Sequence, residues 1–178
     1  MAAIALLSYS FVALAQSADA VPQPSQVEVD QDWQPDPVQT FQDWQLKCEA
    51  EKKRCYIFQN TNLQETGQKV LGVVVGNLGP DGKYILHLVV PLGIYIPPGV
   101  AIKINLGDQI DIPVHTCTPV GCEATLDLKP ELVFALESST TVNVAFLDAV
   151  TRRQITVGVS MAGFRQANAA LRRALSLQ

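Results

Sequence analysis

Apolar and polar side chains alternate along most of the chain between Phe41 and Met161. Alternation with period two places one side of a β-strand on a core and the other side in water. Two further runs, Val70–Val75 and Tyr84–Val90, are apolar almost throughout, which is typical of more central strands or of strands buried on both faces. The alternating apolar positions are Trp44, Leu46 and Cys48; Val100, Ile102, Ile104 and Leu106; Ile110, Ile112 and Val114; Ala124, Leu126 and Leu128; Val142, Val144 and Phe146; and Ile155, Val157 and Val159. The pattern predicts a series of short strands.

Turn signals separate these runs at short intervals, at 79–82, 97–99 and 106–108. Proline fixes φ and glycine adopts positive φ without strain, so both residues mark tight turns. Because no helical period interrupts the runs, we predict an all-β fold, an antiparallel β-sandwich of roughly 8–11 short strands. The prolines Pro97, Pro98 and Pro113 should lie in turns or at sheet edges, since proline donates no hydrogen bond to a strand ladder.

Only the C-terminal tail changes period. After Gly163, the residues Phe164, Ala167, Leu171 and Ala174 recur three or four positions apart, which is the spacing of one helix face. This face is mostly alanine and buries little area. We therefore predict a C-terminal amphipathic helix that packs on the sheet, in preference to a helix that lies on a membrane surface.

The first twenty residues predict export. Residues 1–15 carry no charged side chain and have the length and composition of the apolar core of a signal peptide. They are too few to span a bilayer, which needs about 20 apolar residues. The triplet Ala18-Asp19-Ala20 fits the small-x-small rule for signal peptidase, although the first basic residue of the chain is Lys47. We predict a signal peptide at 1–20; the alternative is a buried N-terminal strand or helix.

Residues 21–40 hold four prolines and four acidic residues without a base. Proline restricts φ and removes a donor, so this stretch resists both helix and central strand. We predict an extended linker at 21–40 that leads into one domain at 41–178. Trp33 is unusual in a linker, because an indole normally lies on a surface. It either docks on the domain or contacts a partner.

Composition and charge remove two classes of protein. Hydrophobic residues make up 48% of the 178 residues, which is enough apolar material to form a core and argues against wholesale disorder. The formal net charge is −4. An acidic balance of this kind offers no clustered Lys and Arg for phosphates, so we predict no binding to nucleic acid.

Four cysteines occur at two short spacings, Cys48 with Cys55 and Cys117 with Cys122. An even cysteine count in an exported chain indicates disulfides. The sequence leaves three connectivities open, of which nearest-neighbour pairing across two hairpin ends is the simplest. The rival is a metal site, but these spacings are looser than those of zinc knuckles.

The sequence offers few catalytic candidates. His87 lies inside an apolar run, where a hydrogen-bonded structural imidazole is commoner than a catalytic one, and His115 lies at a predicted strand end. No G-x-S-x-G motif presents a serine nucleophile, and the glycine-rich run 72–84 lacks residues that a phosphate-binding loop requires. Asp108 and Asp111, three apart on a strand, point to opposite faces. We predict that the protein is not an enzyme and assign no catalytic, cofactor-binding or metal-ligating residue.

Four blocks in one order resemble the invasion-associated locus B family of exported bacterial proteins. They cover about residues 41–175, and the second and third blocks are the more specific. The blocks are Phe41-x-x-Trp44-x-x-x-Cys48 with Cys55 soon after; the run from Val90-Pro91-Leu92-Gly93 to Pro97-Pro98-Gly99-Val100; Cys117-Thr118-Pro119-Val120-Gly121-Cys122-Glu123-Ala124; and Gly163-Phe164. One departure from the family pattern is Asn105, where an acidic residue is expected. The resemblance implies a periplasmic or surface-associated protein, with namesake members linked to bacterial entry into host cells, and it implies no enzymatic activity.

We therefore predict a periplasmic or secreted, non-catalytic protein that needs no cofactor, has no transmembrane span in its mature chain and binds an unidentified envelope or host component. Candidate contact residues are those that the core does not explain: Trp33, Tyr95 and the loop Glu49–Arg54. Tyrosine suits an interface because it adds area and a hydroxyl at little entropic cost. The alternative is a periplasmic small-molecule carrier or a hydrolase with an unrecognised site. An apolar cavity inside the sandwich would favour the carrier.

Overall fold

The computed structural model describes residues 38–49, 54–62, 69–79 and 82–176, all within one compact unit of the chain. These residues form eleven β-strands and two α-helices. The elements are β1 (Gln39–Phe41), β2 (Trp44–Glu49), β3 (Arg54–Asn62), β4 (Lys69–Asn77), β5 (Tyr84–Val90), β6 (Val100–Ile104), β7 (Gln109–Ile112), β8 (Val114–Thr118), β9 (Gly121–Asp127), α1 (Pro130–Glu137), β10 (Thr141–Leu147), β11 (Gln154–Ser160) and α2 (Phe164–Ser176).

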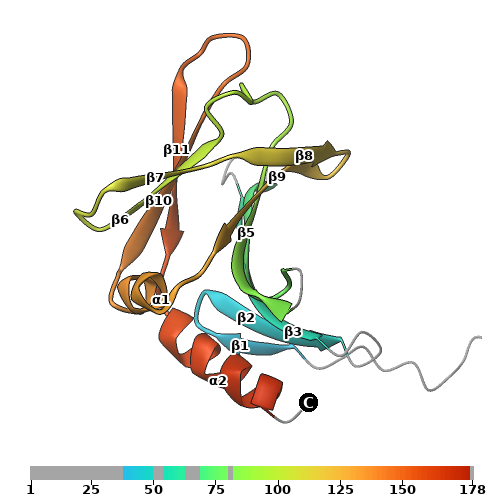
Figure 1. Cartoon of the computed structure of the whole chain (residues 1–178), viewed down its shortest axis with the longest axis vertical. Helices are drawn as coiled ribbons and strands as arrows, with labels where there is room; N and C mark the ends of the chain where they lie inside the picture. The colour runs from blue at the N-terminus through green and yellow to red at the C-terminus, as the bar shows by residue number, and fades with distance from the viewer. Residues whose placement is uncertain (1–37, 50–53, 63–68, 80–81, 177–178) are drawn as a thin grey trace, which may run out of the picture. The chain divides into compact units, whose positions relative to one another are not determined.

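The strands form two sheets (Figure 1). Seven strands make one sheet in the order β1-β2-β3-β4-β5-β9-β8, and four strands make the other in the order β11-β10-β6-β7. Every pairing of neighbouring strands is antiparallel. The structure confirms the predicted antiparallel fold and the predicted range of strand number.

The inward side chains of both sheets share one hydrophobic core, which makes the pair of sheets a sandwich. Members from the seven-stranded sheet include Ile57, Val75, Leu88 and Ala124, and members from the four-stranded sheet include Val100, Ile102, Val144 and Phe146. Five of them, Ala124, Val100, Ile102, Val144 and Phe146, are alternating apolar positions of the sequence, and Val75 and Leu88 belong to the two runs that are apolar throughout. Period two therefore identified the core side of β2, β6, β7, β9 and β10 correctly.

The two runs that are apolar throughout form β4 and β5, which lie in the interior of the seven-stranded sheet. Leu71, Val73 and Val75 of β4 are buried on the core side. The prolines also lie where they were predicted: Pro97 and Pro98 are in the turn before β6, and Pro113 lies between β7 and β8.

Two predicted core positions, Ile155 and Leu106, are wrong. Ile155 lies near the start of the edge strand β11, and its side chain is 43% exposed. Leu106 continues the alternation of β6, but its side chain is fully exposed. The strand ends at Ile104, and Asn105 adopts a φ of 52°, a left-handed conformation that asparagine tolerates better than most residues. Gly107 then donates its N–H to the Ile104 carbonyl over 3.0 Å. The turn signal at 106–108 marks this turn, whereas the alternation of β6 runs on through it; the turn places Leu106 in solvent.

The helix α1 interrupts the strands, where the strand pattern of the sequence predicted no helix. Pro130 occupies the first turn of α1 and Glu131 follows it there; both are helix-start signals. Val133 and Leu136 are the buried residues of this helix. The helix is only about two turns long, so the spacing of its apolar residues is easily mistaken for part of the strand pattern.

The C-terminal helix α2 packs against β1, β2 and β3, as the amphipathic pattern predicted (Figure 1). Phe164 and Leu171 are buried in the core. The rings of Phe164 and Trp44 meet edge to face with centroids 4.9 Å apart, a favourable aromatic geometry. Burial of a phenylalanine side chain contributes about 2–3 kcal/mol, so Phe164 fastens the start of α2.

The N-terminal end of the described structure differs slightly from the predicted linker boundary. Strand β1 begins at Gln39 and pairs with β2 through Leu46, so ordered structure includes the last two residues of the predicted linker 21–40. Across the ranges that the structure describes, no helix is both long and apolar enough to cross a membrane. The predicted signal peptide at 1–20 lies outside the described residues.

Candidate functional site

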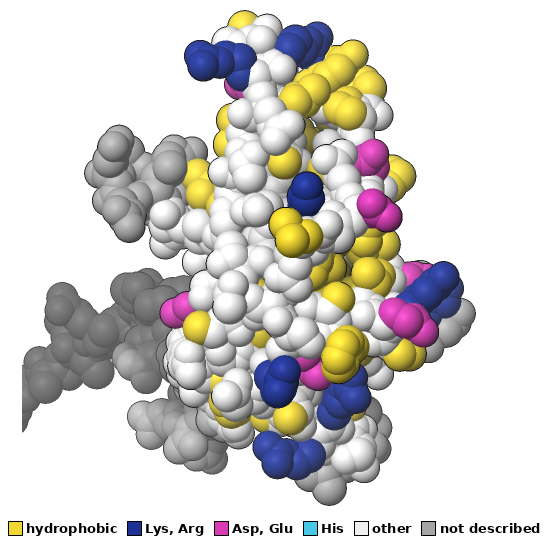
Figure 2. All heavy atoms as spheres, turned by 90° about the vertical axis from the view of Figure 1, so that its left-hand side faces the viewer, with side chains coloured by type: hydrophobic (Ala, Val, Ile, Leu, Met, Phe, Trp, Pro, Cys, Tyr) yellow, Lys and Arg dark blue, Asp and Glu magenta, His cyan; other side chains and the backbone are white. Residues whose placement is uncertain are grey.

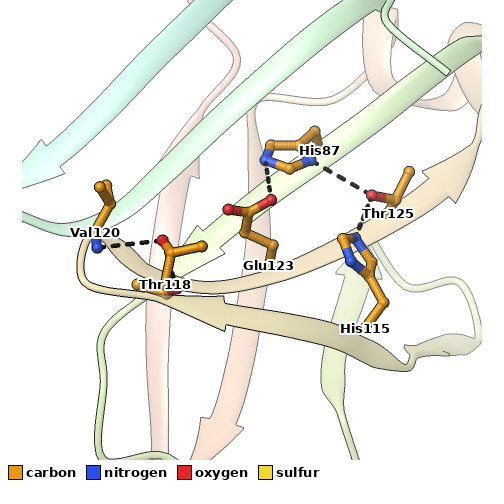
Figure 3. Close-up of polar contacts among 7 residues, drawn as sticks. His87, His115, Thr118, Val120, Glu123 and Thr125 are labelled. Atoms are coloured by element: carbon orange, nitrogen blue, oxygen red, sulfur yellow. Dashed lines mark hydrogen bonds and ion pairs between the residues drawn. The ribbon is translucent and has the colours of Figure 1, made fainter.

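Both histidines of the chain meet on the outer face of the seven-stranded sheet. His87 belongs to β5 and pairs with Thr125 of β9, while Glu123 lies two residues earlier on β9. Residues two apart on a strand share a face, and the intervening Ala124 is buried in the core. The side chains of His87, Glu123 and Thr125 therefore project away from the core (Figure 3).

A β-bulge adds His115 to this group. In the β8–β9 ladder, Val114 pairs with Ala124 and Thr116 pairs with Glu123. His115 is thus the extra residue of the bulge. Bulges re-aim side chains and concentrate at sheet edges, and β8 is an edge strand. The imidazole of His115 consequently turns toward Thr125 on the outer face (Figure 3).

The contacts form a compact group that we call the histidine cluster: His87, His115, Glu123 and Thr125. The Thr125 Oγ1 lies 2.9 Å from His115 Nε2 and 3.4 Å from His87 Nδ1. The other ring nitrogen of His87, Nε2, lies 3.6 Å from Glu123 Oε2. The two imidazole centroids are 6.4 Å apart.

Burial lowers the pKa of His87; Glu123 opposes this shift and His115 adds to it. The net shift favours the neutral imidazole of His87, which is the form that can act as a metal ligand. The side chains of His87 and Glu123 are 23% and 26% exposed, so solutes can reach them.

A disulfide braces the hairpin that carries the cluster. Cys117 and Cys122 face each other across β8 and β9 and are bonded. The turn between them is closed by Thr118, whose hydroxyl donates to the Gly121 carbonyl and accepts from the Val120 N–H (Figure 3). The second disulfide joins Cys48 and Cys55 across β2 and β3. Nearest-neighbour pairing is confirmed.

Sequence reasoning named both histidines but did not place them together, because they lie 28 positions apart. Their meeting depends on the β5–β9 register and on one bulged residue. The only sequence signal was indirect: His115 and Glu123 each lie close to a cysteine of the same short pair, so a hairpin disulfide would bring them near each other.

Two loops form a second surface at one end of the sandwich. We define this tip as residues 92–98, between β5 and β6, and residues 148–153, between β10 and β11. Backbone hydrogen bonds join the first loop to the second loop and to the end of β10: the Ala149 N–H donates to Gly93 O over 2.8 Å, and the Tyr95 N–H donates to O of Leu147, the last residue of β10, over 2.7 Å. The tip is therefore a paired structure, with the two loops fixed against each other.

Asp148 fixes the second loop of the tip. Its carboxylate accepts hydrogen bonds from the backbone N–H groups of Val150 and Thr151 and from the Thr151 hydroxyl. These bonds, those from Thr151 first, lower the pKa of Asp148. The loop is a short capped turn that presents its side chains to solvent.

The tip exposes apolar and basic side chains together. Leu92, Ile96 and Val150 are 56%, 47% and 87% exposed. The Arg152 guanidinium lies 3.5 Å from the centroid of the Tyr95 ring, a cation–π contact. Figure 2 shows hydrophobic side chains next to Lys and Arg at the end of the domain that carries the β10–β11 turn.

An open groove of about 530 Å³ runs beside the tip. Leu92, Ile94 and Phe146 form part of its wall, and Ile155–Gly158 of β11 form another part. Among the residues that the structure describes, β11 is an edge strand of the four-stranded sheet, so the groove lies beside a sheet edge. A separate cavity between the two sheets, lined by core residues such as Val75, Leu88 and Val144, holds only about 20 Å³. That space fits about one water molecule and no organic ligand.

The remaining predicted contact residues fall on different parts of the chain. Tyr95 lies within the tip, half-buried beneath Arg152. Trp33 lies outside the described residues, as do residues 50–53 of the loop Glu49–Arg54. The ends of that loop are joined, because Arg54 Nε donates to Glu49 Oε2 over 3.0 Å.

A family model described as "Invasion associated locus B (IalB) protein" matches residues 44–172. This chain belongs to the invasion associated locus B family. The match spans the strands from β2 to β11, the tip and the histidine cluster. The resemblance seen in the sequence blocks is thereby confirmed.

Relatives and a solved structure agree with this assignment. Invasion protein B homologs from Brucella abortus strain 2308 and from Brucella abortus biovar 1 strain 9-941 are each 30% identical to the chain over 165 residues, covering 89% of this chain and 88% of the homolog. The crystal structure of invasion associated protein b from Bartonella henselae superposes with a TM-score of 0.68 at 25% identity. It covers 80% of this chain and 98% of the Bartonella chain.

Proposed function

We propose that the protein is an exported, non-catalytic interaction module that binds a protein of the bacterial envelope or of a host cell through its tip. The observation that carries this proposal is the tip itself, where two hydrogen-bonded loops hold Leu92, Ile96 and Val150 in solvent. Exposed apolar side chains on a rigid frame are typical of a contact surface. Family membership supports a link to invasion, since the relatives carry that name.

The chemistry of the tip favours a protein partner. Apolar side chains need an apolar counterpart, and Arg152 and Arg153 beside them favour carboxylates on that partner. The adjoining groove lies beside β11, an edge strand of the described part of the chain, and such an edge offers backbone N–H and C=O groups to an extended segment. A partner segment with apolar and acidic side chains fits both features.

Export is supported by three features: the apolar leader 1–20, the two disulfides and the family. Disulfides persist in oxidising compartments. Intact-mass analysis of the natively expressed protein tests this part of the proposal. We expect a mass that lacks residues 1–20 and contains no free thiol; a mass that includes the leader would contradict it.

The contact surface is tested by photo-crosslinking in intact cells. A photoreactive residue at Leu92 or Val150 should capture a discrete product. The matched control is Phe134 on α1, which is 71% exposed but lies outside the tip. The same product should weaken when Arg152→Glu is combined with the Val150 probe. Equal capture at Phe134 and at the tip would contradict a specific contact surface.

A hydrolase is the catalytic competitor, and the histidine cluster is its strongest candidate. Thr125, His87 and Glu123 follow the order of a nucleophile, a base and a carboxylate. However, the two distances are 3.4 Å and 3.6 Å, longer than the 2.6–3.2 Å expected for such a relay. These residues also lie outside the groove and the interior cavity described above. Hydrolysis of ester substrates that Thr125→Val abolishes would overturn the non-catalytic proposal.

A further inference from the structure

The histidine cluster combines the only two imidazoles of the chain with a carboxylate. One ligand atom each of His87, His115 and Glu123 lies within 4.8 Å of the others. These residues come from three adjacent strands, so their convergence is a product of the fold and of the His115 bulge. It is independent of the proposed binding role of the tip.

The donor set determines which ions fit. Two imidazole nitrogens and one carboxylate oxygen suit Zn²⁺ or Cu²⁺, whereas Mg²⁺ and Ca²⁺ prefer an all-oxygen shell. Ligands around a tetrahedral zinc ion lie about 3.4 Å from one another, given zinc–ligand bonds of about 2.0–2.2 Å. The His87 Nε2 to Glu123 Oε2 distance is already 3.6 Å. Small side-chain rotations bring the three groups onto one ion.

Thr125 supplies the outer support that ligand histidines normally have. A ligating imidazole usually hydrogen-bonds through its second nitrogen, which fixes the orientation of the ring. The Nδ1 of His87 faces Thr125 Oγ1, and this leaves Nε2 directed at Glu123. The same hydroxyl contacts His115, so Thr125 acts as a positioning residue for both rings.

The backbone around the cluster is held in place. Glu123 directly follows Cys122, and His115 lies two residues before Cys117, so the disulfide closes the hairpin next to both side chains. Partial exposure of His87 and Glu123 leaves a route for an ion and room for a water ligand.

From this geometry we propose that His87, His115 and Glu123 form a binding site for one Zn²⁺-type transition-metal ion, with Thr125 orienting the two imidazoles. The site has three protein ligands and an open fourth position, which water fills.

Isothermal titration of the untagged, chelator-treated full chain with ZnCl₂ tests the proposal. We expect one Zn²⁺ per chain and no comparable binding of MgCl₂ or CaCl₂. His87→Gln, His115→Gln and Glu123→Gln should each weaken Zn²⁺ binding more than tenfold, and Thr125→Val by about tenfold or more. The control is Asp127→Asn, which removes an exposed carboxylate from the same strand and should leave Zn²⁺ affinity unchanged.

Nuclear magnetic resonance provides a second readout, because every histidine signal of the chain comes from this cluster. Zn²⁺ should shift the ring signals of both His87 and His115, and Glu123→Gln, which keeps both rings, should reduce the shifts at equal Zn²⁺. Circular dichroism identifies any variant that fails to fold. If a variant is unfolded, the shift of the histidine ring signals of the wild-type chain on Zn²⁺ addition is the remaining test of the site. Absence of Zn²⁺ binding, unchanged ring signals, or equal loss in Asp127→Asn would overturn the proposal.

Discussion

Gly163 turns the chain from β11 into α2 at a point where no other residue fits. Its φ is 86°, and a Cβ atom there would lie 1.8 Å from the carbonyl oxygen of Phe41. The following residue, Phe164, packs on Trp44. The Gly163-Phe164 block of the sequence thus joins a backbone requirement to a core contact.

Gly163→Ala should therefore lower the free energy of unfolding by about 2–4 kcal/mol, because the backbone must move to relieve the overlap. Chemical denaturation followed by circular dichroism measures the change. Gly82→Ala is the control: Gly82 also has a positive φ, 71°, but a Cβ there meets nothing within 4 Å, so we expect only about 1 kcal/mol. Equal losses would show that φ alone matters.

Asn105 has a residue-scale explanation as well. The family pattern led us to expect an acidic residue there, and the structure places Asn105 at a φ of 52°. Asparagine is enriched in this conformation because its short side chain tolerates it. The departure from the pattern fits the turn that ends β6.

At the scale of elements, a chain of polar contacts joins β5, α2 and α1. The Tyr84 hydroxyl of β5 donates to Asn168 Oδ1 of α2, and Asn168 Nδ2 donates to Glu137 Oε1 of α1 over 2.6 Å. Asn168 is completely buried. A buried amide needs such partners, since an unsatisfied one costs about 1–3 kcal/mol. The contacts fix both helices against the sheet.

Tyr84 should titrate late in this setting. Burial raises the pKa of Tyr84 to about 12, above the value near 10 of an unfolded tyrosine. Its contribution to stability is therefore complete below about pH 10 and lost as pH rises through about 12. Ultraviolet titration of the tyrosine side chains should show one component near pH 12. This component should be absent from the Tyr84→Phe variant and present in the Tyr56→Phe variant. A late component that survives Tyr84→Phe would contradict this assignment.

The short helix α1 shows where element prediction failed. Pro130 and Glu131 mark its start, but the apolar residues Val133 and Leu136 cover less than two turns. A period that short does not separate helix from strand. Contact with α2 and the core decided the outcome, as tertiary packing commonly does for short helices.

At the scale of the whole molecule, the two disulfides brace separate regions of one sheet. One bond joins β2 to β3 and the other joins β8 to β9. Strands β4 and β5 lie between these hairpins, which places them about 14 Å apart at the usual strand spacing. Each bond therefore acts on its own hairpin.

Removing either bond, as Cys48→Ser/Cys55→Ser or Cys117→Ser/Cys122→Ser, should lower the free energy of unfolding by about 2–2.5 kcal/mol, given the short loops. Removing both should cost the sum, since distant sites are additive. Urea unfolding of the three variants measures this. A combined loss well below the sum would indicate that the hairpins are coupled.

The Cys117→Ser/Cys122→Ser variant should also weaken Zn²⁺ binding more than the Cys48→Ser/Cys55→Ser variant does, because only the Cys117–Cys122 bond adjoins the histidine cluster.

The sequence by itself determined most of the strands, the turns, the C-terminal helix and the family. Each of these features depends on residues that are close together in the sequence. Alternation identifies a strand face, proline and glycine mark turns, and short cysteine spacings favour hairpin disulfides. The sequence also identified Tyr95 as a candidate contact residue, but it did not indicate that the Arg152 guanidinium would lie over the Tyr95 ring.

Tertiary structure decided which surfaces could act. The tip exists because residues 92–98 and 148–153, far apart in the sequence, are joined by backbone hydrogen bonds. The histidine cluster exists because β5, β9 and β8 are neighbours and because one bulged residue turns His115 outward. Strand order and register arise from burial of the whole core, and no local pattern in the chain encodes them.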